Sequence, residues 1–133
     1  MKRILLFLCV LWFQSYAQIS WTVDGKLKDG SVLTTISHEL PNEWHTYWKN
    51  PGESGLGATI HFDTPSISGT LVFPQPNVID EAGLVTYGYV DSVNYQLILS
   101  GWQPNSTINA TLHWLECLDL CIQQSAPIKL SIP

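Results

Sequence analysis

The stretch Ile-Asn-Ala-Thr-Leu-His-Trp at residues 108–114 indicates most clearly how this chain folds. Its apolar residues Ile108, Ala110, Leu112 and Trp114 alternate with polar ones. Successive side chains of a β-strand point to opposite faces of a sheet, so this stretch predicts a strand with one buried and one exposed face.

The same period of two recurs along most of the chain, and no stretch has a helical period. Turn-forming pairs such as Asp-Gly and Pro-Asn separate the apolar sets. We therefore expect about seven to nine short strands in an all-β, immunoglobulin-like antiparallel β-sandwich. Two loops stand out: 49–57 contains three glycines and a proline, and 74–83 is longer than a hairpin needs. Long loops on a rigid sandwich often carry function. The further alternating sets are Ile19, Trp21 and Val23; Val32, Thr34 and Ile36; Ala58, Ile60 and Phe62; Val93, Tyr95, Leu97 and Leu99; and Ile128, Leu130 and Ile132.

The first residues have the pattern of a secretory signal peptide. Lys2 and Arg3 precede an apolar run over residues 4–13, and Ser15 and Ala17 then place small residues at the two positions that a signal peptidase reads. The run is about half of the roughly 20 residues that span a bilayer, although an uncleaved anchor is the alternative. We expect residues 1–17 to be the signal peptide and 18–133 to form one exported domain.

The charge balance of the exported part is acidic. The chain has 6 basic and 11 acidic residues, and cleavage after Ala17 removes two basic ones, which leaves a net charge of −7 (4 − 11). An acidic surface repels a phosphate backbone, so nucleic acid is excluded as a partner.

The exported part keeps two cysteines, Cys117 and Cys121, with three residues between them. Such a pair in an exported protein favours a disulfide. A disulfide needs Cα atoms roughly 4.4–6.8 Å apart, whereas an extended strand would separate these two by about 13 Å. The chain must therefore turn between them if they bond. A ring this small adds little by loop closure, which favours a redox role over a structural one but leaves both open.

Three readings of the cysteine pair remain at this point. The first is a thiol–disulfide exchange site, in which the neighbouring carboxylates of Glu116 and Asp119 would raise the thiol pKa if they lie close. The second is an exported module that binds a protein or glycan through Trp44 and carries a structural disulfide. The third is a copper-handling site in which His113 joins the two thiolates.

Four segments together resemble a known family. They are Trp-His-Thr-Tyr-Trp-Lys-Asn-Pro-Gly at 44–52, Phe-Pro-Gln-Pro at 73–76, Thr-Tyr-Gly-Tyr at 86–89, and Trp-Leu-Glu-Cys-Leu-Asp-Leu-Cys at 114–121. Over about residues 19–132 the chain resembles the periplasmic N-terminal domain of DsbD-type and ScsB-type thiol:disulfide interchange proteins. Most relatives continue into a membrane region and a thioredoxin-like domain, so we expect a stand-alone version or a fragment.

The resemblance implies an immunoglobulin-like sandwich in the periplasm that acts as a component of a protein-disulfide reductase. Its redox group would be the cysteine pair itself, with no cofactor and no bound metal. Electrons would come from a membrane-embedded or thioredoxin-like module and pass to oxidised disulfide isomerases or other thioredoxin-like proteins. Cys121 would attack the partner's disulfide, and Cys117 would resolve the mixed disulfide.

The resemblance also implies a loop that shields the disulfide, and this chain departs from the family there. Asp80, Glu81 and Ala82 occupy the place of that loop, but Ala82 is too small to shield as an aromatic ring would. We expect Tyr87 or Tyr89 to substitute for the missing aromatic side chain. Asp80, Glu81 and Asp119 are the expected supporting residues.

Overall fold

A computed structural model describes residues 18–133, which form ten strands and no helix. The predicted signal peptide, residues 1–17, lies outside the described residues. Within 18–133 no helix is long and apolar enough to cross a membrane. The strands are β1 (Gln18–Lys26), β2 (Val32–Glu39), β3 (His45–Gly52), β4 (Thr59–Phe62), β5 (Ser68–Val72), β6 (Asn77–Glu81), β7 (Leu84–Val90), β8 (Ser92–Ser100), β9 (Ser106–Cys117) and β10 (Cys121–Ile132).

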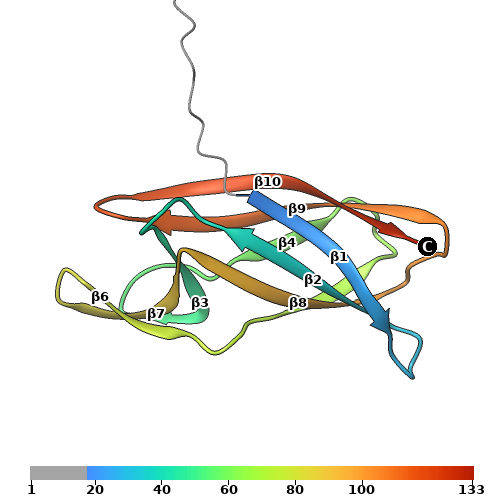
Figure 1. Cartoon of the computed structure of the whole chain (residues 1–133), viewed down its shortest axis with the longest axis horizontal. Helices are drawn as coiled ribbons and strands as arrows, with labels where there is room; N and C mark the ends of the chain where they lie inside the picture. Colours follow the sequence, from blue (N-terminus) through green and yellow to red (C-terminus); the bar gives the residue numbers. More distant parts are fainter. Residues whose placement is uncertain (1–17) are drawn as a thin grey trace, which may run out of the picture.

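The strands form two antiparallel sheets packed face to face (Figure 1), which confirms the predicted all-β sandwich. One sheet has the order β1-β2-β8-β5. The other has the order β10-β9-β3-β7-β6, and β4 pairs with β9. The longest hairpin joins β9 to β10, and its register runs unbroken from Cys121 opposite Cys117 to Ile132 opposite Ser106.

The buried faces of the sheets are those that the alternation predicts. Along β9, Ile108, Ala110, Leu112 and Trp114 are all buried, while the polar residues between them are not. Thr34 is the polar member of the predicted core, and its burial has a simple reason. Its hydroxyl accepts a hydrogen bond from the Trp21 indole and donates one to the Leu97 carbonyl, at 2.9 and 2.8 Å.

The strand count exceeds the prediction because the expected loop at 74–83 contains a strand. Its residues 77–81 are β6, which pairs with β7. Ala82 and Gly83 form the two-residue turn between them, both with positive φ (51° and 88°), the backbone geometry that such tight hairpins need. The turn is stabilised by Asp80, whose carboxylate accepts a hydrogen bond from the Gly83 amide at 2.9 Å.

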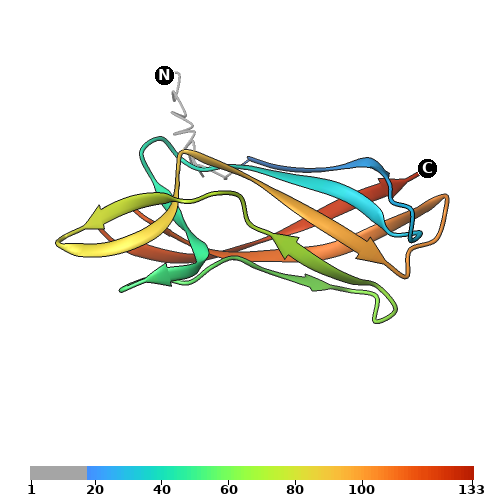
Figure 2. The same cartoon turned by 90° about the horizontal axis from the view of Figure 1, so that it is seen from below.

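Both hairpin turns of functional interest lie at one end of the molecule. In two perpendicular views (Figures 1 and 2) the β6–β7 turn and the β9–β10 turn lie together, and the C-terminus lies at the opposite end. Because the register along β9 and β10 is unbroken, the two cysteines lie at the end of the sandwich where β6 also ends.

His38 is buried in the sandwich as a neutral residue and should make stability depend on pH. Its ring packs edge-on against Trp114, with centroids 4.6 Å apart, and neither ring nitrogen has a hydrogen-bond partner within residues 18–133. Burial lowers the pKa of His38 from 6.5 to about 4. Below pH 6.5 the unfolded chain therefore binds a proton that the folded chain does not, and stability falls until the pH reaches about 4.

We expect His38 to account for a loss of roughly 2–3 kcal/mol in the free energy of unfolding between pH 7 and 4.5. Urea unfolding of the His38→Leu variant at the two pH values should show most of that loss removed. His61→Leu is the matched control, because His61 is exposed on β4. An equal loss of stability in wild type and His38→Leu would contradict this assignment.

Candidate functional site

The two cysteines form a disulfide at the tip of the longest hairpin. Cys117 ends β9, Cys121 begins β10, and the two face each other in register with Cα atoms 4.1 Å apart. Three residues make the turn, and the Leu118 amide donates to the Leu120 carbonyl at 3.1 Å. This confirms the predicted bond and the predicted turn between the cysteines.

The two halves of the disulfide differ in their access to solvent. Cys117 is fully buried, with a relative exposure of 0%, whereas Cys121 is exposed. An attacking or leaving sulfur in a partner protein can therefore reach Cys121 directly. A partner's sulfur cannot reach Cys117 directly, because the surrounding side chains cover it.

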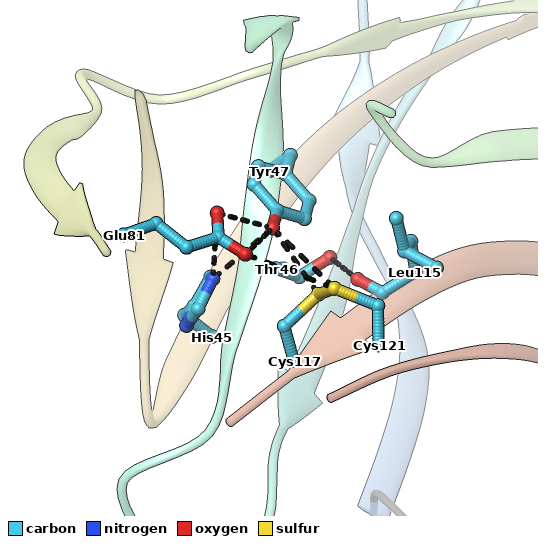
Figure 3. The surroundings of a disulfide bond; sticks show 7 residues. All are labelled: His45, Thr46, Tyr47, Glu81, Leu115, Cys117 and Cys121. Carbon is cyan, nitrogen blue, oxygen red and sulfur yellow. Dashed lines mark hydrogen bonds and ion pairs between the residues drawn. A yellow bond between two sulfur atoms is a disulfide. The ribbon is translucent and has the colours of Figure 1, made fainter. Parts of the chain in front are cut away.

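Tyr47 lies against the buried side of the disulfide (Figure 3). Its hydroxyl oxygen is 3.1 Å from Cys117 Sγ and 3.9 Å from Cys121 Sγ. The same oxygen is 2.9 and 2.7 Å from the two carboxylate oxygens of Glu81. A phenol has one proton, so at any moment it donates to one of these neighbours and accepts from others. Burial, and then the Glu81 carboxylate, raise the pKa of Tyr47, so the hydroxyl stays protonated.

The position of Tyr47 follows from the pairing of β3. His45 pairs with Cys117 in the sheet, and Tyr47 lies on the same face two residues on. Between them, the Thr46 hydroxyl donates to the Leu115 carbonyl at 2.8 Å and ties β3 to β9. The ring also rests on Gly55, where an added Cβ would lie 2.4 Å from the ring carbons.

Glu81 comes from the end of β6 and completes the site. Its Oε1 lies 3.8 Å from Cys121 Sγ, and its Oε2 lies 3.6 Å from His45 Nε2. His45 Nε2 is also 3.2 Å from the Tyr47 hydroxyl. The Glu81 side chain is 20% exposed, so it connects this buried network to solvent.

The tyrosine beside the sulfurs is Tyr47, which corrects the expectation that Tyr87 or Tyr89 substitutes for the missing aromatic shield. Tyr87 packs edge-on against Trp48, with centroids 6.2 Å apart. Tyr89 is buried between the sheets, where its hydroxyl donates to the Pro74 carbonyl at 2.8 Å. His45 and Tyr47 were not identified from the sequence as site residues; their spacing of two, which places both on one face of a strand, is the signal that could have linked them.

The carboxylate beside the sulfurs is Glu81, one of the expected supporting residues, and not Glu116 or Asp119, which flank the cysteines in the sequence. Glu116 points to the opposite face from Cys117, where it accepts hydrogen bonds from the Trp114 indole and the Gln124 amide, each at 3.1 Å. Asp119 is exposed in the turn, and Asp80 stabilises the β6–β7 turn. Of the acidic residues predicted near the pair, Glu81 is the one that the structure places in contact with it.

The groups around the disulfide form a hydrogen-bond network rather than a cage for a metal ion. His113, the imidazole of the copper reading, is exposed on β9 opposite Thr59 and Ser125. The ligand atoms of His45, Glu81 and Cys117 do lie within 4.8 Å of one another. The Tyr47 hydroxyl occupies the space between them, at 3.2, 2.7 and 3.1 Å, and its ring is fixed by burial.

Trp44 and Trp48, the residues of the binding-module reading, are partly buried and pack against the core. These two indoles therefore do not form an exposed aromatic platform, whereas Cys121 of the disulfide is exposed. A β-sandwich that presents a small-ring disulfide at one end, with one accessible sulfur, belongs to the class of thiol:disulfide interchange domains.

Comparison with known proteins gives the family. Residues 16–132 match the family model described as thiol:disulfide interchange protein DsbD, N-terminal, and the chain belongs to that family. Among solved structures, the N-terminal periplasmic domain of ScsB from Proteus mirabilis is similar, with a TM-score of 0.72 and 27% sequence identity. The match covers 84% of this chain and 44% of the ScsB chain. No curated protein sequence matches the chain at a significant level.

Proposed function

We propose that the protein passes electron pairs to oxidised periplasmic proteins by thiol–disulfide exchange. The Cys121 thiolate attacks a partner disulfide, forms a mixed disulfide and expels one partner thiolate. Cys117 then attacks Cys121, which closes the internal disulfide and releases the partner's second thiolate. The partner gains two electrons and the pair loses two. The difference in exposure between Cys121 and Cys117 is the observation that carries this proposal.

A thioredoxin-like partner, such as a disulfide isomerase, suits the surface around Cys121. Leu118, Leu120 and Ile122 are exposed by 44%, 62% and 38%, and all belong to the hairpin that holds the disulfide. The β6–β7 hairpin adds Val78 and Leu84, exposed by 69% and 44%. Contiguous exposed apolar side chains mark a surface that another protein covers. A membrane-embedded or thioredoxin-like module is the proposed electron donor.

Membership in the family and the similarity to a periplasmic ScsB domain support a periplasmic location. Export would follow from residues 1–17 acting as a signal peptide, which leaves 18–133 as the working domain.

The test is electron transfer from the reduced protein to an oxidised thioredoxin-fold protein, compared with transfer to glutathione disulfide. Leu120→Ser should slow transfer to the folded protein about tenfold or more, because an uncharged polar group replaces an apolar contact next to the reacting sulfur. Transfer to glutathione disulfide, which makes no such apolar contact, should not be slowed.

Leu27→Ser is the matched control, because Leu27 is 39% exposed in the β1–β2 turn at the other end of the sandwich. It should leave both rates unchanged. Failure of the wild-type protein to reduce any oxidised thioredoxin-fold protein would contradict the proposed function.

A further inference from the structure

The proposed exchange reaction, on which this inference rests, requires the buried Cys117 to lose its thiol proton. Before Cys117 attacks the mixed disulfide it must lose its thiol proton, since the thiolate is the nucleophile. Cys117 has no exposed surface, so water cannot take the proton directly. The protein itself must provide the route.

Tyr47 is placed to carry that proton. Within residues 18–133, its hydroxyl is the side-chain oxygen in hydrogen-bond contact with Cys117 Sγ, at 3.1 Å. The same hydroxyl is 2.7 Å from a Glu81 oxygen, and Glu81 is partly exposed. Cys117, Tyr47 and Glu81 therefore form a continuous chain from the buried thiol to solvent.

We propose that Tyr47 and Glu81 relay the proton of Cys117. The thiol proton passes to the Tyr47 oxygen while the Tyr47 proton passes to the Glu81 carboxylate. The Cys117 sulfur bonds to Cys121, and the Cys121–partner bond breaks. The partner thiolate leaves with the electron pair and takes a proton from solvent. When a donor reduces the disulfide, the same chain runs backwards and returns a proton to the Cys117 thiolate.

His45 is a positioning residue in this relay. Its Nε2 lies 3.6 Å from Glu81 Oε2 and 3.2 Å from the Tyr47 hydroxyl, so it fixes both groups in reach of each other. The titratable groups facing the sulfurs are His45 and Tyr47 from β3 and Glu81 from β6. From β9 and its turn, Glu116 faces away and Asp119 is exposed.

The two steps of exchange can be timed separately with dithiobis(nitrobenzoate), a small disulfide whose reduction releases a coloured thiolate. With one reagent molecule per reduced protein, the first release reports the attack of Cys121 and the second reports the attack of Cys117. The Cys9→Ser background leaves the pair as the only thiols.

Tyr47→Phe should slow the second release about a hundredfold and leave the first unslowed, because a positioned proton acceptor contributes at least that much. Glu81→Gln should do the same. In both variants the rate of the second release should rise more steeply with pH than in wild type, because loss of the Cys117 proton then depends on hydroxide that enters during transient opening of the site.

Tyr89→Phe and Asp80→Asn are the matched controls, because each removes the same group at a site that does not touch the sulfurs. Both should give wild-type rates. A second release in Tyr47→Phe within twofold of wild type would overturn the relay, as would equal slowing of both releases with an unchanged pH profile. Absence of the first release in wild type would instead overturn the proposed function, and the relay with it.

Discussion

Replacing Cys121 with Ser is expected to abolish electron transfer while leaving the sandwich folded. The exposed sulfur is the one a partner can reach, so no other group in residues 18–133 can form the mixed disulfide. The bond closes a ring across only three intervening residues, and loop closure of that size contributes roughly 2 kcal/mol to stability. The core strands and their buried faces do not depend on it.

Cys117→Ser is the matched variant and should behave differently. Cys121 still attacks, but nothing resolves the intermediate, so a covalent complex with the partner should accumulate and appear on a non-reducing gel. Circular dichroism and urea unfolding of both variants check the fold. Wild-type transfer rates in Cys121→Ser, or unfolding of both variants at room temperature, would mean that the disulfide is structural.

Gly55→Ala is expected to have the largest effect on stability, about 4 kcal/mol. Gly55 has φ of +98°, where an alanine is strained by about 1–3 kcal/mol. Its Cβ would also lie 2.4 Å from the ring of Tyr47, which is fully buried, and such overpacking adds about 1–3 kcal/mol. Urea unfolding gives the difference directly.

Gly30→Ala separates the two contributions. Gly30 has a similar φ of +86°, but an added Cβ there meets nothing within 4 Å. Gly30→Ala should therefore lower the free energy of unfolding only by the cost of backbone strain, about 1–2 kcal/mol. Equal losses in the two variants would show that Tyr47 is not held by contact with Gly55. Because Gly55→Ala pushes the ring away from the sulfurs, it should also slow the second step of exchange.

The sequence was sufficient to predict the sandwich because its signal is local. Alternation identifies the buried face of a strand without knowledge of its neighbours, and Ile108 to Trp114 are buried as that rule requires. The turn between Cys117 and Cys121 was equally predictable, because the bond length and strand geometry leave no other solution.

The site was predicted only in part because it is assembled from strands far apart in the sequence. Tyr47, Glu81 and Cys117 meet through the pairing of β3, β6 and β9, which no local pattern specifies. The pairing of β7 with β3 is one such long-range contact. A Cβ on Gly88 would lie 2.0 Å from the Thr46 carbonyl oxygen, which shows how closely β7 packs on β3. The side chain of the next residue, Tyr89, lies between the sheets and away from the sulfurs.

Position 82 carries no aromatic residue. Ala82 forms part of the β6–β7 turn with φ of 51°, and Cys121 is exposed. Protection of the buried sulfur comes from Tyr47 beneath the disulfide instead. Cys121 is therefore accessible to a partner protein, whereas Cys117 is covered by the side chains around it.

The reduction potential of the Cys117–Cys121 pair tests the central claim most directly. Equilibration of the protein in glutathione buffers, followed by alkylation of free thiols, gives the fraction reduced at each potential. A working exchange site predicts a value above about −250 mV, within the range of disulfides that trade electrons with other proteins. A value below about −300 mV would identify a structural bridge and contradict the proposed function.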